Sequence, residues 1–111
     1  MKILFIIYLL LLVSCTTTKS PLYESKHDYK QRDYNRAFNV LFTARKENNP
    51  KIHYALGYLY YYGLGVAKDQ DLARFWIRSA AAENYPPAIE AFKLITTPRQ
   101  AQYIPLQKIN L

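Results

Sequence analysis

The residues that could carry out chemistry in this chain are few, and they form no catalytic set. The 111-residue sequence has one cysteine, Cys15, and two histidines, His27 and His53. The histidines lack metal-ligand spacing, and a lone cysteine excludes an internal disulfide or a cysteine-based zinc site. His53 is expected on a helix surface. Because no Ser/His/Asp set, catalytic carboxylate pair or phosphate loop is visible, we expect no enzymatic activity, no metal and no cofactor.

Cys15 follows a segment that is typical of an export signal. Lys2 is followed by eleven apolar residues, Ile3 to Val13, and then by Ser14. One positive charge, a short apolar core and small residues at its end describe a secretory signal peptide. A membrane-spanning helix needs about 20 apolar residues, so the length disfavours a transmembrane anchor.

The end of this segment, Leu12-Val13-Ser14-Cys15, resembles the lipobox of bacterial lipoproteins. The resemblance implies that residues 1–14 are removed as a signal peptide and that Cys15 carries covalent lipid, such as palmitate. Two or more acyl chains make anchoring of this kind stable. The alternative is a chance cysteine near the cleavage site of a soluble exported protein. By the same family analogy, Thr16 favours the outer membrane, with the protein on its periplasmic face.

Export also decides what the basic charge of the chain means. A formal net charge of +7 would by itself suit nucleic acid, anionic lipid or an acidic glycan. An exported protein meets no chromosomal nucleic acid, so we expect no nucleic-acid partner. The expected partner is an envelope protein or peptide, with peptidoglycan as the alternative, and the membrane is reached through the lipid anchor.

Beyond a short lipid-anchored linker at 15–22, apolar periodicity predicts a helical domain over 23–97 and a tail over 98–111. Aspartates precede two of the expected helices as N-caps, and asparagine and proline mark their ends. The expected helices are Tyr23–Gln31, Asp33–Glu47, Pro50–Tyr62, a helix that begins after Asp69, and Pro87–Ile95. A glycine inside a helix costs about 1 kcal/mol relative to alanine, so Gly57 indicates close approach of a neighbouring helix near Ala73 or Ala80.

The helical domain contains an internal repeat. Core and capping positions recur at an offset of 36 residues: Asp33, Ala37 and Ala44 correspond to Asp69, Ala73 and Ala80. Helix–turn–helix repeats of 34 to about 40 residues are typical of α-solenoids.

The complete unit resembles the Sel-one-like repeat, a relative of the tetratricopeptide repeat. The motif residues are Leu56, Gly57, Tyr60, Gly63, Gly65, Val66, Asp69, Ala73, Trp76, Ala80 and Ala81. The resemblance implies an all-α fold, a short α-solenoid of antiparallel helix–turn–helix repeats with one complete unit and flanking half-units. Asn84-Tyr85 and Lys93 depart from the family pattern, where glycine is usual, so the last helix is expected to be a terminal cap.

The tyrosines of the helix at 50–62 are the predicted binding residues. In the repeat family the first helix of each unit lines the concave surface, which implies a partner-binding surface of Lys51, Tyr54, Tyr58, Tyr61 and Tyr62. Tyrosine offers a large contact area with a polar group and is enriched in binding hot spots. Tyr60 lies on the opposite, packing arc. The alternative is that the apolar C-terminal tail covers these rings within the same molecule.

The sequence therefore predicts a lipid-anchored envelope protein that acts as a non-catalytic scaffold or adaptor through its tyrosine-rich repeat surface. Two alternatives remain open. The first is a peptidoglycan-associated or cell-wall-active protein, and the second is an accessory subunit of an envelope or secretion complex, with the tail as its docking segment.

Overall fold

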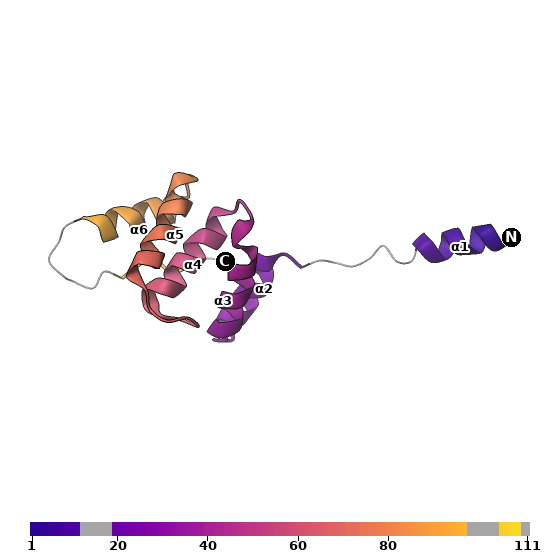
Figure 1. The fold of residues 1–111 in the computed structure, drawn as a ribbon, viewed down its shortest axis with the longest axis horizontal. Coiled ribbons are helices and arrows are strands. Elements are labelled where there is room, and N and C mark those ends of the chain that lie inside the picture. The colour runs from indigo at the N-terminus through magenta and orange to yellow at the C-terminus, as the bar shows by residue number, and fades with distance from the viewer. Residues whose placement is uncertain (12–18, 98–104, 110–111) are drawn as a thin grey trace.

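The fold, given by a computed structural model, is a row of packed helices; the structure describes residues 1–11, 19–97 and 105–109 (Figure 1). All regular elements in these ranges are helical. They are α1 (Lys2–Leu11), α2 (Pro21–Lys30), α3 (Tyr34–Thr43), the 3₁₀ helix η1 (Ala44–Lys46), α4 (Pro50–Tyr62), α5 (Gln70–Ala82) and α6 (Pro86–Thr96). The predicted all-α fold is thereby confirmed.

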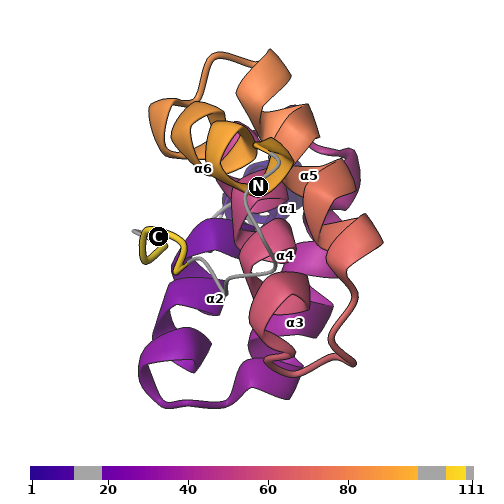
Figure 2. The ribbon, with the colours of Figure 1, turned by 90° about the vertical axis from the view of Figure 1, so that its left-hand side faces the viewer.

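Helices α2 to α6 pack in sequence-adjacent pairs, as expected of a short helical solenoid. Figure 2 shows α4 in the middle, with α2 and α6 on one side of it and α3 and α5 on the other. The most extensive helix–helix contact joins α4 and α5, the two halves of the complete repeat unit. This arrangement leaves α4 surrounded by neighbours.

The helix ends follow from local capping chemistry. The carboxylate of Asp33 accepts a hydrogen bond from the Arg36 amide, and that of Asp69 accepts from the first turn of α5. At the end of α4, Gly63 has φ +68° and caps the helix in the left-handed conformation. The N-cap roles predicted for Asp33 and Asp69 are therefore confirmed.

Three of the predicted helices have different boundaries in the structure. The segment Asp33–Glu47 is not one α-helix, because α3 ends at Thr43 and continues as η1 to Lys46. A tightened 3₁₀ turn is a common way to satisfy the last carbonyls of a helix. At the other end, α2 begins at Pro21, two residues before the predicted domain start, because Ser20 caps it and Pro21 suits the first helical position. The last helix gains one residue at each end and spans Pro86–Thr96.

The repeated small residues lie in the core. Ala37, Ala73 and Ala80 are fully buried, and Ala44 is nearly so. Larger side chains fill the space between the helices, and the fully buried ones include Leu41, Ile52, Leu56, Leu59 and Ile77. The 36-residue offset read from the sequence therefore marks equivalent packing positions.

Gly57 brings α4 and α5 close together. A Cβ atom added at Gly57 would lie 2.6 Å from Cγ1 of Ile77 and 3.0 Å from the carbonyl oxygen of Ala73. Both contacts come from α5, so the predicted close approach is confirmed at Ala73, and Ile77 is the additional neighbour.

The apolar N-terminal segment forms α1, which lies apart from the other helices (Figure 1). Its described side chains, from Ile3 to Tyr8, are exposed. No helix in the described part of the chain has the length and apolar character needed to cross a membrane. Cys15 and the other lipobox residues lie outside the described residues, so their predicted role stays a prediction.

Candidate binding surfaces

The tyrosines predicted to form an open surface are buried in the structure. Tyr54 is 1% exposed and Tyr58 and Tyr61 are each 7% exposed, while Tyr62 is half-buried and Lys51 is exposed. The expectation of an open tyrosine surface is therefore wrong for this chain. The physical reason is that α4 is the central helix, and α2, α6 and the C-terminal segment lie on its tyrosine side (Figure 2).

The C-terminal segment at 105–109 contacts these tyrosines directly. The Tyr54 hydroxyl donates a 2.7 Å hydrogen bond to the carbonyl oxygen of Gln107, and the Leu106 amide donates one of 2.7 Å to the Tyr62 hydroxyl. Leu106 and Ile109 are buried in the core cluster. Of the two arrangements left open by the sequence, the described part of the tail adopts the one that covers the rings.

The tyrosines also pack against one another and lose contact with water. Ring centroids are 5.6 Å apart for Tyr54 and Tyr85 and 4.7 Å apart for Tyr58 and Tyr62. Burial raises the pKa of Tyr54 and of Tyr58 well above the ordinary value of 10.0, because the phenolate loses its hydration. Neighbouring tyrosines add to the rise in both pKa values.

These raised pKa values predict alkaline unfolding. Below pH 10 the tyrosines are neutral in both states, whereas above it the unfolded chain loses protons that the folded chain retains, so stability falls as pH rises. Each such tyrosine steepens the fall by up to about 1.4 kcal/mol per pH unit. Urea midpoints from circular dichroism at pH 8 to 11 should decline, and Tyr54→Phe with Tyr58→Phe should flatten the decline. The exposed Tyr23→Phe is the control, and an equal flattening by Tyr23→Phe would contradict the assignment.

A second group of aromatic side chains lies on the opposite side of the domain, on α3 and α5. Phe42, Leu72 and Phe75 are 37%, 40% and 59% exposed. Phe42 stacks on Phe38 and Phe75 packs edge-on against Trp76, with centroid distances of 5.5 and 5.1 Å. The Arg45 guanidinium lies 4.1 Å from the Phe42 ring centre, a cation–π contact. We call Phe42, Arg45, Leu72, Phe75 and Trp76 the aromatic surface.

The sequence-based interpretation missed this surface, although a signal was present. Phe75 falls about 200° around its helix from Ala73, which places it opposite the core side. A large aromatic side chain on that side lies away from the core, and in the structure Phe75 stays 59% exposed and contacts Trp76. Phe42 also lies partly outside the packed face of its helix, since more than a third of it is exposed.

His53, buried beneath the aromatic surface, contacts both Arg45 and Trp76. Its Nε2 lies 3.0 Å from the Arg45 carbonyl oxygen, and its Nδ1 lies 3.0 Å from Glu83 Oε1 and 3.2 Å from the Ser79 hydroxyl. Its ring also packs against Trp76, with centroids 5.4 Å apart. His53 is 7% exposed, so its predicted place on the helix surface is wrong. It connects η1, α4 and α5 instead.

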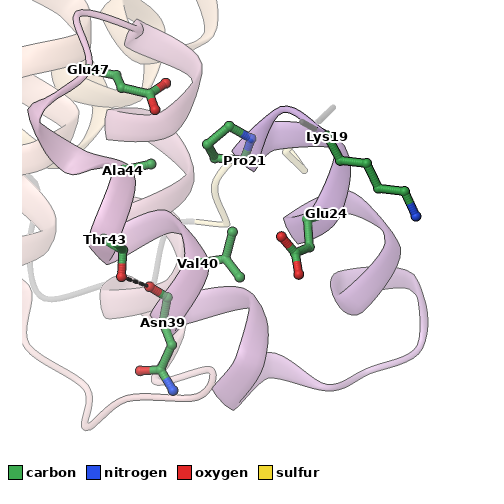
Figure 3. A pocket seen from close by; sticks show the side chains of 8 residues that line it. All are labelled: Lys19, Pro21, Glu24, Asn39, Val40, Thr43, Ala44 and Glu47. Carbon is green, nitrogen blue, oxygen red and sulfur yellow. Dashed lines mark hydrogen bonds between the residues drawn. The ribbon is translucent and has the colours of Figure 1, made fainter. Parts of the chain in front are cut away.

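The groove between α2 and α3 is lined by both polar and apolar side chains (Figure 3). Its volume is about 390 Å³, and its walls carry Glu24, Val40 and Thr43. The Thr43 hydroxyl donates to the carbonyl oxygen of Asn39 one turn earlier, so the helix itself engages it. Among the described residues no cluster of three or more potential metal ligands occurs.

Comparison with known families supports the repeat. The family model of the Sel1 repeat matches residues 51–85, which contain most of α4, the glycine turn and α5. No curated protein and no solved structure matches the chain significantly. The central helical hairpin is thus a Sel1-like repeat, and repeats of this family generally serve as non-catalytic modules for protein–protein interaction.

Proposed function

We propose that this protein is an exported, lipid-anchored adaptor that binds a partner protein of the bacterial envelope through its aromatic surface. The Sel1-like repeat supports protein binding, and the lipobox-like Leu12-Val13-Ser14-Cys15 supports anchoring through lipid on Cys15. The tether and the binding surface are separate parts of the chain, as an adaptor requires.

We assign partner binding to this surface because large apolar side chains on α3 and α5 are exposed there. Within residues 19–97, five large apolar residues are exposed, and three of them, Phe42, Leu72 and Phe75, belong to the aromatic surface. Clustered exposed apolar groups with a polar rim mark interaction sites. Aromatic and arginine side chains are also the residues most enriched in binding hot spots.

The charges around this surface indicate what kind of partner it fits. Arg45 lies against Phe42, and Arg74 and Arg78 are exposed on α5 beside Phe75. Arg74 forms a 3.4 Å ion pair with Asp71, whose side chain is 94% exposed and therefore contributes little. A partner that presents apolar side chains flanked by carboxylates would complement the surface.

Photocrosslinking in cells tests the binding surface. A photoreactive residue in place of Phe75 should give one discrete crosslinked protein, whereas the same residue in place of the exposed Lys93 on α6 should not. With that partner purified, Phe75→Ala should weaken binding by at least tenfold, the effect expected of a hot-spot residue. Equal crosslinking from both positions, or unchanged affinity, would place the partner elsewhere.

Two further measurements separate the alternative functions. Release of a stoichiometric complex on detergent extraction would identify an accessory subunit rather than a transient adaptor. Retention on purified peptidoglycan that Phe75→Ala does not reduce would favour a cell-wall-associated role.

The anchor has its own test. Cys15→Ser should abolish labelling by a palmitate analogue and move the protein from the membrane to the soluble fraction. Ser14→Ala keeps a small residue before the cysteine and should leave labelling unchanged. Undiminished labelling of Cys15→Ser would contradict lipid attachment at this position.

A further inference from the structure

We propose that the tyrosine side of α4 is a binding site for an extended peptide, and that residues 105–109 occupy it as an internal ligand. The peptide it takes carries two apolar side chains three residues apart. Figure 2 shows α2 and α6 on one side of α4, and on the other side α3 and α5, the helices that carry Phe42, Leu72 and Phe75. The proposal does not depend on the adaptor function above.

The hydrogen bonds at this site recognise main chain. Tyr54 donates to the carbonyl oxygen of Gln107, and Tyr62 accepts from the amide of Leu106. These two tyrosines lie eight residues apart on α4, and their hydroxyls contact adjacent residues of the segment. Because both bonds go to backbone atoms, any extended peptide could form them, whatever its side chains at those positions.

Side-chain selectivity comes from two anchors. Leu106 and Ile109 are 5% and 9% exposed, whereas Gln107 and Lys108 between them are exposed. The anchors belong to the same buried cluster as Tyr54 and Tyr58. An irregular segment whose two buried apolar side chains flank two exposed residues resembles a linear peptide bound in a groove.

The segment is incompletely packed against the helix beside it. A pocket of about 380 Å³ remains between α6 and the segment, lined by Pro87, Glu90, Ala91, Leu94, Pro105 and Gln107. The pocket is open to solvent, since Glu90, Leu94 and Gln107 on its walls are exposed, so the segment covers this side of α6 only in part. A competing peptide would meet a site that is already shaped and partly open.

The tail therefore limits access to the site. A tethered ligand acts at an effective concentration of about a millimolar, so a free peptide must compete with it. Removing the tail's anchors should raise the apparent affinity for the same peptide in trans.

Fluorescence anisotropy with a labelled synthetic peptide of residues 104–111 tests the proposal on the purified full-length chain. Leu106→Asp with Ile109→Asp should bind the peptide at least tenfold more tightly than the unchanged chain does. Gln107→Asp with Lys108→Asp adds the same two carboxylates at outward positions and should behave like the unchanged chain. We call the Leu106→Asp, Ile109→Asp double variant the open variant. Adding Tyr54→Phe and Tyr62→Phe to it should weaken peptide binding again, because both hydrogen bonds to the peptide main chain are lost.

Equal binding by the open variant and the unchanged chain, or no binding by an open variant that keeps its helical circular dichroism, would overturn the proposal. If the open variant fails to fold, a second measurement on the unchanged chain tests the proposal instead. Excess peptide added to the unchanged chain should speed hydrogen exchange at the Leu106 amide while the α4 amides stay protected. Unchanged exchange at Leu106 would show that the segment is a fixed part of the fold.

Discussion

Gly65→Ala is expected to destabilise the domain more than any other single-methyl addition in the glycine turn. Gly65 has φ +68°, and an added Cβ would clash with the backbone carbonyl of Tyr34 and lie 2.7 Å from the Asn35 nitrogen. The left-handed conformation costs an L-residue about 1–2 kcal/mol, and overpacking adds about 1–3 kcal/mol. The clash involves backbone at the start of α3, which cannot rotate away as a side chain could.

The melting temperature should reveal this cost. A loss of about 3 kcal/mol lowers the midpoint of a domain this small by roughly 12–24 °C. Native domains have only about 5–15 kcal/mol of stability in total, so a large fraction of the variant would unfold near physiological temperature. Circular dichroism at 222 nm during heating measures the shift.

Gly63→Ala is the matched control for this prediction. Gly63 has the same φ of +68°, but its added Cβ would approach the Lys68 side chain, at 3.1 Å, together with backbone atoms of Lys68 at 3.3 Å and beyond. It should therefore cost mainly the conformational term of about 1–2 kcal/mol. Equal melting temperatures for the two variants would show that the turn does not pack against α3, and that the repeat units are less tightly coupled than the structure indicates.

His53→Ala is expected to have the second large effect, a loss of about 2–4 kcal/mol. The substitution removes the ring nitrogen that faces the Arg45 carbonyl oxygen and the ring that packs against Trp76. It also leaves a cavity between η1, α4 and α5, because His53 is buried. Urea denaturation followed by tryptophan fluorescence reports directly on this region, since Trp76 is the sole tryptophan of the chain.

Glu83→Gln separates the role of the ring from that of its ion pair. The Glu83 side chain is 32% exposed, and a glutamine keeps an oxygen and a nitrogen within reach of Nδ1. Its expected cost is below about 1 kcal/mol, as for other partly exposed ion pairs. If Glu83→Gln cost as much as His53→Ala, the charge on Glu83 rather than the buried ring would hold the three helices together.

Several structural features could be predicted from the sequence because they depend on neighbours along the chain. Asp33 and Asp69 cap helices through their own next turn, and Gly63 ends α4 because glycine tolerates positive φ. The recurrence of Ala37 at Ala73 indicated equivalent buried positions for the same reason, since a helix repeats its contacts with a fixed period. These features could be predicted without knowing which helices pack against one another.

The binding surfaces were harder to predict, because periodicity locates the faces of a helix but not their neighbours. Periodicity separated the tyrosine-rich arc of α4 from the opposite, packing arc that contains Tyr60. Which of them is open depends on how many elements surround the helix, and every residue from Ile52 to Tyr61 is buried. A helix buried all round has neighbours on every side. The same error placed His53 at the surface.

By itself, the sequence determined the all-α class, the repeat unit and its caps, because these rest on local backbone preferences and on a period that any reader of the chain can count. Only the tertiary structure decided that the tyrosines face inward and that Phe42 and Phe75 face solvent. The contact between Tyr54 and Gln107 spans 53 residues of sequence, and no local preference specifies it. This contact forms because burying both apolar sides of α4 against distant segments, including residues 105–109, lowers the free energy of the folded chain.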